Sequence, residues 1–125
     1  MTEVLTQINK IPKYAWVHDY YYVSNYGYVL NSKRGKRIEP YNQGNSRCQI
    51  WLYGLGKRKK EYDYRVVAEA FVPNPLNKSD INHLDENPFN SRADNLAWCT
   101  KKENNQYGNK EKRHRENLKK KIWKK

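Results

Sequence analysis

Alternating apolar and polar residues in the first third of the chain predict a β-hairpin. Residues 20–24 and 28–30 flank the turn Asn25-Tyr26-Gly27, as the two strands of a hairpin do. Residues 37–39 are a candidate third strand, which ends at Pro40 because proline cannot donate a hydrogen bond to a strand ladder. This region therefore predicts antiparallel strands joined by short turns.

A more regular alternation follows in residues 47–53 and predicts a strand with one buried face. One face carries Cys48, Ile50 and Leu52, and the other carries Gln49, Trp51 and Tyr53. Residues 59–62 can pair back across the turn at residues 54–56. The first half therefore predicts one small antiparallel sheet, preceded by residues 1–14, which carry little pattern beyond Ile11-Pro12, typical of the start of an extended segment.

Helical spacing replaces the alternation after residue 62. Asp63 is a suitable N-cap, and Pro73 and Pro75 end the segment. Four apolar residues between these limits lie three and four positions apart, which places them on one helical face: Val66, Val67, Ala70 and Phe71. We expect this helix to cover the sheet and to support the segment that follows it.

The next segment has the pattern strand, polar loop, strand and capped helix. Apolar runs at residues 81–84 and 96–99 enclose a loop rich in Asp, Asn and Ser. Thr100 and Glu103 form a capping box at the start of a helix. A hairpin packed on that helix can bring His83, Asn95 and Asn104 together, although they are distant in sequence.

These elements predict an α+β fold with three parts. Residues 1–63 form a β-rich N-terminal part with a small antiparallel sheet, and residues 64–108 contain a helix followed by the hairpin and helix. Residues 109–125 form a basic C-terminal helix or a flexible arm. No apolar run is long enough for a membrane span, and the N-terminus does not have the pattern of a signal peptide.

The charge of the chain points to a polyanionic partner. Lys and Arg number 25 against 13 Asp and Glu, a formal charge of +12. Nucleic acid is the first candidate and an anionic membrane the second. Basic residues gather at the predicted turns and in the tail, and we expect them to contact DNA: Lys33, Arg34, Lys36, Arg37, Lys57, Arg58, Lys59, Lys60, Arg113, Arg115 and Lys119.

Some of these residues have a second interpretation. Residues 57–60 are equally typical of a solvated hairpin tip, and Trp51 can be a core residue or a DNA contact. Most of the eleven Tyr and four Trp residues are expected in the core. Cys48 and Cys99 lack the spacing of a zinc site, and we expect isolated buried thiols rather than a disulfide.

The polar residues of the hairpin segment suggest chemistry when they are taken together. His83 can act as a general base near neutral pH, and Asn104 offers a carbonyl oxygen suitable for Mg²⁺. Combined with the basic charge, they suggest metal-assisted phosphodiester hydrolysis. Each residue alone is more often structural, so composition by itself favours a plain nucleic-acid-binding domain.

Order and spacing strengthen the nuclease interpretation. The segment Asn82-His83-x-Asp85-x-Asn87, followed by Asn90, Asp94-Asn95-Leu96-x-Trp98-x-Thr100 and Glu103-Asn104-Asn105, closely resembles the HNH nucleases of phages and mobile introns. Residues 67–75 resemble the helix and proline-containing link before the HNH hairpin. Residues 21–29 resemble the nuclease-associated DNA-binding motif of HNH homing endonucleases, so the resemblance covers roughly residues 14–107.

The resemblance implies a ββα-metal fold with one divalent metal, Mg²⁺ before Mn²⁺. His83 would activate water, Asn82 and Asn104 would bind the metal, and Asn95 would tie the loop and help to hold His83. The substrate would be double-stranded DNA, cut to 5′-phosphate and 3′-hydroxyl ends, often as a nick. The resemblance further implies a cytoplasmic monomer in a bacterial or phage-infected cell, with no membrane partner and no small-molecule cofactor.

Three positions depart from the family pattern. Relatives often carry Asp at position 82, so the metal is held less tightly here unless Asp85 helps. Relatives often carry His at Tyr64 and Gly at Glu86, where a positive φ strains any other residue. These departures keep open a DNA-binding protein of the same ancestry that no longer cuts. A basic RNA-binding or protein-binding domain is the third alternative.

Overall fold

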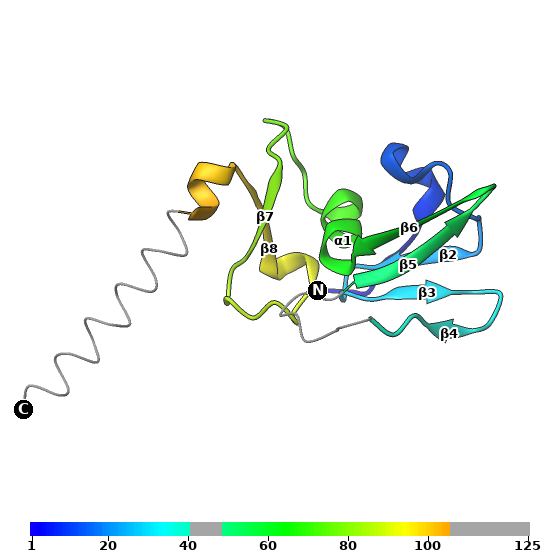
Figure 1. The fold of residues 1–125 in the computed structure, drawn as a ribbon. Helices are drawn as coiled ribbons and strands as arrows, with labels where there is room; N and C mark the ends of the chain where they lie inside the picture. The colour runs from blue at the N-terminus through cyan, green and yellow to red at the C-terminus, as the bar shows by residue number, and fades with distance from the viewer. Residues whose placement is uncertain (41–48, 106–125) are drawn as a thin grey trace, which may run out of the picture.

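The structure is a computed structural model that describes residues 1–40 and 49–105 of the chain. Its first sheet is antiparallel with the strand order β1-β2-β3-β4. The strands are β1 (Leu5–Gln7), β2 (Tyr21–Ser24), β3 (Val29–Asn31) and β4 (Lys36–Arg37) (Figure 1). Cys48 and the predicted basic helix or arm, with Arg113, Arg115 and Lys119, lie outside the described residues.

A separate two-stranded hairpin corrects the prediction of one continuous sheet. Among the described residues, strands β5 (Gln49–Gly54) and β6 (Lys57–Tyr62) form a sheet only with each other, and an isolated bridge joins Val17 to Gly54. The predicted alternation is confirmed, because Ile50 and Leu52 are buried while Trp51 and Tyr53 are exposed. Gly54 has no room for a side chain, since a Cβ there would overlap the backbone of Trp16.

The N-terminal residues contain more structure than their pattern predicts. β1 pairs with β2, and two 3₁₀ helices follow, η1 (Ile8–Lys10) and η2 (Pro12–Tyr14). Ile11 between them is extended, but Pro12 opens η2 rather than a strand. Ile8 and Tyr14 are buried in the core, and the Tyr14 hydroxyl donates to Oε2 of Glu61 on β6 at 3.0 Å. Elements this short carry no period that sequence reasoning can detect.

Helix α1 (Asp63–Phe71) lies at the centre of the molecule, between the β5–β6 hairpin and the C-terminal hairpin (Figure 1). Val66 and Val67 are buried, as the helical spacing predicts. The N-cap is Tyr62, so the prediction of Asp63 as N-cap is wrong by one residue. Asp63 is the first helical residue, and its Oδ1 accepts from the backbone N–H of Tyr64 at 2.6 Å and from Oγ of Ser91 at 3.1 Å.

The buried position of Asp63 makes the stability of the fold depend on pH. Burial raises the pKa of this carboxyl from 3.8 to about 6, and the hydrogen bonds from Ser91 and Tyr64 oppose the rise. A raised carboxyl pKa means that the folded state holds its proton more tightly than the unfolded state. The contribution of Asp63 to stability is therefore full below pH 4 and is lost as the pH rises to about 6.

We accordingly expect Asp63→Asn to gain stability relative to the wild type as the pH rises from 4 to 7. The gain has an upper limit of about 3 kcal/mol, because one pKa unit corresponds to about 1.4 kcal/mol. Urea denaturation of both proteins at intervals of one pH unit measures the difference and cancels the titration of all other groups. A difference that stays constant over this range would contradict the prediction.

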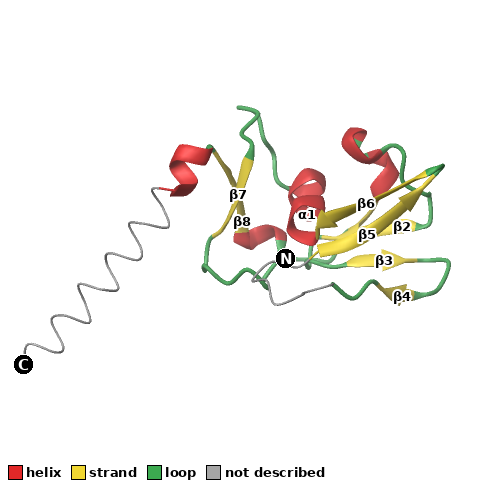
Figure 2. Cartoon of the chain, in the orientation of Figure 1, coloured by secondary structure: helices red, strands yellow, loops and turns green. Residues whose placement is uncertain are grey.

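The C-terminal hairpin pairs β7 (Asp80–His83) with β8 (Leu96–Cys99), and the 3₁₀ helix η3 (Ala93–Asn95) precedes β8. The short helix at residues 101–105 follows directly (Figure 2). The capping box is confirmed: the backbone N–H of Glu103 donates to Oγ1 of Thr100, and the backbone N–H of Thr100 donates to Oε1 of Glu103, both at 3.0 Å. The α+β class is therefore confirmed.

Two further sequence expectations can be compared with the described residues. Cys99 is a buried free thiol, as expected, and burial raises its pKa, with Asp80 and Glu103 adding to the rise. Within residues 1–40 and 49–105, no helix combines the length and apolar character that crossing a membrane requires.

Candidate active site

Strand β7 presents His83 to helix α1. The Tyr64 ring meets the imidazole edge-on, with 4.7 Å between ring centroids and 74° between planes. Tyr62 stacks on Tyr64 in turn, at 5.2 Å and 17°. The Nε2 atom of His83 is buried in this contact region. Tyr64, one of the departures from the family pattern, therefore packs edge-on against the His83 ring.

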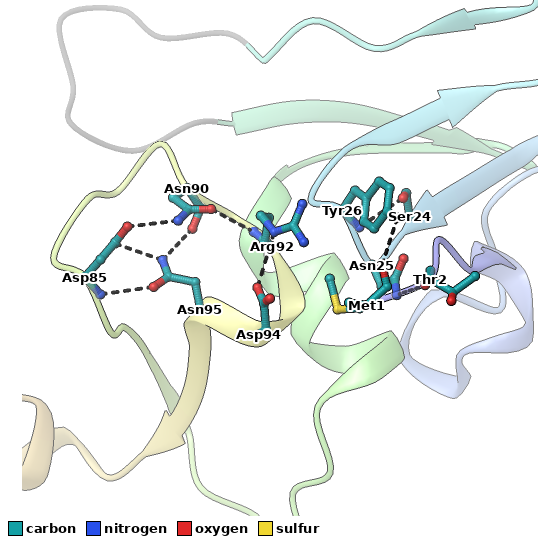
Figure 3. Close-up of polar contacts among 10 residues, drawn as sticks. All are labelled: Met1, Thr2, Ser24, Asn25, Tyr26, Asp85, Asn90, Arg92, Asp94 and Asn95. Carbon is teal, nitrogen blue, oxygen red and sulfur yellow. Dashed lines mark hydrogen bonds and ion pairs between the residues drawn. The ribbon is translucent and has the colours of Figure 1, made fainter.

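Asn95 ties the loop that follows His83 to the start of β8 (Figure 3). Its Nδ2 donates to Oδ1 of Asp85 at 2.9 Å and to the backbone oxygen of Asn90 at 2.8 Å. Its Oδ1 accepts from the backbone N–H of Asp85 at 3.0 Å. The backbone also closes here, since the N–H of Leu84 donates to the Asn95 oxygen at 2.8 Å. One buried side chain thus fixes both ends of the loop.

The carboxylate of Asp85 is hydrogen-bonded within the same loop. Its Oδ2 accepts from Nδ2 of Asn90 at 2.8 Å, and its Oδ1 accepts from the backbone N–H of Asn87 at 2.8 Å. The hydrogen bonds from Asn90, Asn87 and Asn95 lower the pKa of the Asp85 carboxyl, so it is ionised at neutral pH. Both carboxylate oxygens of Asp85 therefore accept hydrogen bonds from residues of the loop or its anchor Asn95.

Glu86 has the left-handed conformation that its position in the family pattern, where Gly is usual, predicts. Its φ is +61°, and its backbone N–H donates to the backbone oxygen of His83 at 2.9 Å. A left-handed conformation costs a residue with a side chain about 1–2 kcal/mol relative to the right-handed one. The turn directly after His83 is therefore tight and holds some strain.

The opposite face of β7 carries the amide side chains. Side chains alternate along a strand, so Asn82 lies on the face opposite His83 and shares its face with Asp80. Nδ2 of Asn104, on the following helix, donates to Oδ2 of Asp80 at 3.4 Å. Asn104 therefore contacts the Asn82 face of β7 through Asp80, while His83 lies toward Tyr64 on α1. Asn95 does not join either group and acts on the loop instead.

The donor set on this face is suitable for a hard cation. Amide and carboxylate oxygens are the ligands that Mg²⁺ accepts, together with several water molecules. In the described part of the chain, no cluster of three or more His, Cys, Asp and Glu side chains is placed to hold a metal. The oxygen donors of this face differ from the sulfur and nitrogen ligands of a structural zinc site.

The loop also docks on the N-terminal sheet. The backbone N–H of Ala93 donates to the backbone oxygen of Asn25 at 2.9 Å. Gly27 has a φ of +100°, and a Cβ there would lie 2.7 Å from the backbone carbon of Ser91. The guanidinium of Arg92 lies over the Tyr26 ring at 4.8 Å (Figure 3). The turn predicted at residues 25–27 thus joins the sheet to the hairpin loop.

Cations and aromatic rings share the outward face of the β5–β6 hairpin. The register pairs Trp51 with Lys60 and Tyr53 with Arg58. The Arg58 guanidinium lies 5.0 Å from the Trp51 ring centroid, and Nζ of Lys60 lies 5.5 Å from it. Trp51 is 37% exposed and Tyr53 43% exposed. Trp51 is therefore a surface residue, and its interpretation as a core residue is wrong.

The other predicted DNA contacts in the described residues are also exposed. Lys33, Arg34, Lys36 and Arg37 lie at the β3–β4 turn. Arg37 stacks on Tyr28, with its guanidinium carbon 3.7 Å from the ring centroid. The β3–β4 and β5–β6 turns lie at the end of the molecule away from the β7–β8 hairpin (Figure 1). Lys57 and Lys59 are exposed on β6.

Sequence reasoning missed Asp80 and Arg92. Asp80 lies two residues before Asn82, and the spacing of two is the signal that places both on one strand face. The contact of Arg92 with Tyr26 could not be predicted from the sequence, because the two residues are distant along the chain.

Comparisons with known proteins agree on one family. A family model described as HNH endonuclease matches residues 62–106. The uncharacterized HNH endonuclease L245 of Acanthamoeba polyphaga mimivirus is 34% identical over 88 residues, which are 69% of this chain and 26% of that protein. DNA endonuclease I-HmuI of Bacillus phage SP01 is 33% identical over 85 residues, which are 68% of this chain and 49% of that protein.

The similarity extends to a solved structure. The HNH homing endonuclease I-HmuI, solved in a study of its DNA binding and cleavage, matches with a TM-score of 0.69 and 28% identity. The match covers 83% of this chain and 56% of that chain. This chain spans less than half the length of the two curated relatives.

Proposed function

Because this chain belongs to the HNH endonuclease family, we propose that it is a metal-dependent endonuclease that nicks duplex DNA. The observation that carries the proposal is the arrangement on β7. His83 is held by Tyr64 at the strand end, and the neighbouring Asn82 shares a strand face with a residue that contacts Asn104. His83 and Asn82 are thus adjacent on β7 with side chains on opposite faces of the strand, and Asn104 contacts the Asn82 face through Asp80.

His83 is the general base in this proposal. Imidazole titrates near neutral pH, so it can take a proton from the water molecule that attacks the scissile phosphorus. Tyr64 restricts the ring from one side, and the turn at Glu86 fixes the backbone on the C-terminal side. Asn95 anchors the loop that follows His83. Asp85 helps to hold the same loop through its hydrogen bonds with Asn95 and Asn90.

Asn82 and Asn104 are the proposed ligands of one divalent metal, Mg²⁺ before Mn²⁺. Their amide oxygens fit a hard cation that keeps several water ligands. A metal bound there would neutralise charge on the scissile phosphate and on the leaving 3′ oxygen. The products would carry 5′-phosphate and 3′-hydroxyl ends.

The cationic face of β5–β6 and the β3–β4 turn are the proposed contacts to the DNA backbone. Lys and Arg side chains that neutralise phosphates make binding depend steeply on salt. Trp51 lies beside Arg58 and Lys60, so this face offers an apolar ring between two cations. The proposed enzyme acts as a monomer on double-stranded DNA.

A supercoiled plasmid tests the proposed activity. We expect conversion to the nicked circle with Mg²⁺ or Mn²⁺, and no conversion when EDTA removes the metal. Asn at position 82 and Tyr at position 64 favour the second candidate, a DNA-binding protein that no longer cuts. That candidate predicts salt-dependent binding of the plasmid without any nicked product at any metal concentration.

The double variant Arg58→Gln, Lys60→Gln tests the proposed DNA surface. Each lost phosphate contact should reduce the slope of log affinity against log salt by about 1, so the double variant should lose about 2. Fluorescence anisotropy with a labelled duplex at several salt concentrations measures the slope. Lys10→Gln, which removes an exposed cation on η1, is the control. Equal slopes for both variants would show that the β6 cations do not contact phosphate.

A further inference from the structure

The two proposed metal ligands bring no charge to the cation. Asn82 and Asn104 each offer a neutral amide oxygen, whereas Mg²⁺ sites in proteins commonly include at least one carboxylate. A site of two amides and water leaves both positive charges of the metal to the phosphate. A nearby carboxylate would balance part of that charge, and the face of β7 contains one.

Asp80 is that carboxylate. It lies two residues before Asn82 on β7, so the two side chains leave the same face of the strand. Its Oδ2 accepts from Nδ2 of Asn104 at 3.4 Å, and its Oδ1 accepts from Oγ of Ser79 at 2.9 Å. The side chain is half-buried, so water screens its charge less than at a fully exposed position.

The contact with Asn104 sets the direction of its amide. An amide group carries its oxygen and its nitrogen on one planar unit, so a partner that binds the nitrogen determines where the oxygen faces. With Nδ2 of Asn104 directed to Asp80, Oδ1 of Asn104 faces away from that carboxylate, in a direction from which it could bind a cation. Partners that orient ligands in this way commonly change metal affinity by about 10–100-fold when they are removed.

Other carboxylates of the β7–β8 hairpin, its loop and the following helix have different partners. Asp85 uses both oxygens within the loop. Glu103 caps the helix at Thr100 and forms a salt bridge with Lys78 at 3.0 Å. Asp94 lies beside Arg92 at 3.4 Å. Asp80 is the acidic residue for which the described part of the chain shows a contact with a proposed ligand.

We propose that Asp80 is a positioning residue of the metal site, which orients the Asn104 amide and supplies the negative charge that the two amide ligands lack. The inference rests on the proposed function, because it assumes that Asn82 and Asn104 bind a divalent metal. It also offers a physical reason why Asn can stand at position 82 without loss of the site.

Binding of Mn²⁺ to the full chain, measured by electron paramagnetic resonance without DNA, tests this role apart from cleavage. Asp80→Ala should weaken binding at least tenfold, because both the acceptor and the charge are lost. Asp80→Asn should fall between Asp80→Ala and the wild type, because its oxygen can still accept from Asn104. Asp94→Asn, which removes one charge from the segment between β7 and β8, should bind Mn²⁺ as the wild type does.

The outcomes separate the inference from the proposed function. If the wild type and Asp80→Ala bind Mn²⁺ equally while both proteins are folded by circular dichroism, the role of Asp80 is wrong and the metal site stands. If the wild type binds no Mn²⁺ up to millimolar concentrations, the proposed metal site itself is wrong and the inference falls with it. Equal weakening by Asp80→Ala and Asp94→Asn would also overturn a specific role of Asp80.

Discussion

The variant His83→Ala should nick plasmid DNA about 10²–10⁴-fold more slowly than the wild type and should bind DNA with unchanged affinity. The range is the usual contribution of a positioned general base. Binding should persist because His83 lies against α1 through Tyr64, while the proposed phosphate contacts lie on β6 and at the β3–β4 turn. Single-turnover nicking with Mg²⁺, together with anisotropy on the same duplex, measures both quantities.

His18→Ala is the matched control for this experiment. His18 stacks on Tyr20 at 5.1 Å near the first sheet and has no place in the proposed chemistry. Its loss should leave the nicking rate within about twofold of the wild type, which is the scatter expected for a surface change. If His83→Ala nicks DNA as fast as His18→Ala does, His83 is not the general base.

The variant Asn95→Ala should destabilise the folded protein strongly. Asn95 is buried and makes three side-chain hydrogen bonds within the loop. A typical hydrogen bond contributes about 1 kcal/mol net, and each buried partner left unsatisfied costs more. We therefore expect the free energy of unfolding to fall by about 3 kcal/mol, measured by urea denaturation. Nicking should fall as well, because the turn after His83 loses its anchor.

Asn87→Ala is the control for Asn95→Ala, because it removes an amide side chain from the same loop without removing the Asn95 hydrogen bonds. The Asn87 side chain is exposed and accepts one hydrogen bond, from the backbone N–H of Phe89 at 3.1 Å. Its removal should cost less than about 1 kcal/mol. If Asn95→Ala and Asn87→Ala unfold at the same urea concentration, Asn95 does not tie the loop.

Local patterns predicted much of the fold because their causes are local. The capping box at Thr100 and Glu103 depends on residues three apart, and it is present. The alternation at Ile50 and Leu52 reflects one buried strand face, and both side chains are buried. The positive φ at Glu86 follows from the position of that residue in the motif.

The errors concern features that depend on distant residues. Two 3₁₀ helices in the N-terminal segment bury Ile8 and Tyr14, although three-residue elements have no period in sequence. The predicted sheet is divided into two, and α1 contacts a strand of each, β2 and β6. Asp63 is the first residue of α1 instead of its N-cap, and its carboxylate accepts from Ser91, which is distant in sequence.

The candidate site divides in the same way. The motif identified the residues, but their partners became visible only in three dimensions: Tyr64 beside His83, and Asp80 beside Asn104. The expectation that Asp85 helps to hold a metal stays a prediction, and the hydrogen bonds of Asp85 favour a role in the loop. The roles of Asn82 and Asn104 as ligands likewise stay predictions.

The Mg²⁺ dependence of nicking by the wild type and by Asn82→Asp tests the central claim most directly. If residue 82 binds the metal, a carboxylate there should lower the Mg²⁺ concentration for half-maximal nicking by roughly tenfold, because added ligand charge strengthens cation binding. The account predicts this shift toward lower Mg²⁺. Nicking with the same Mg²⁺ midpoint in both proteins, or nicking that continues in EDTA, would contradict it.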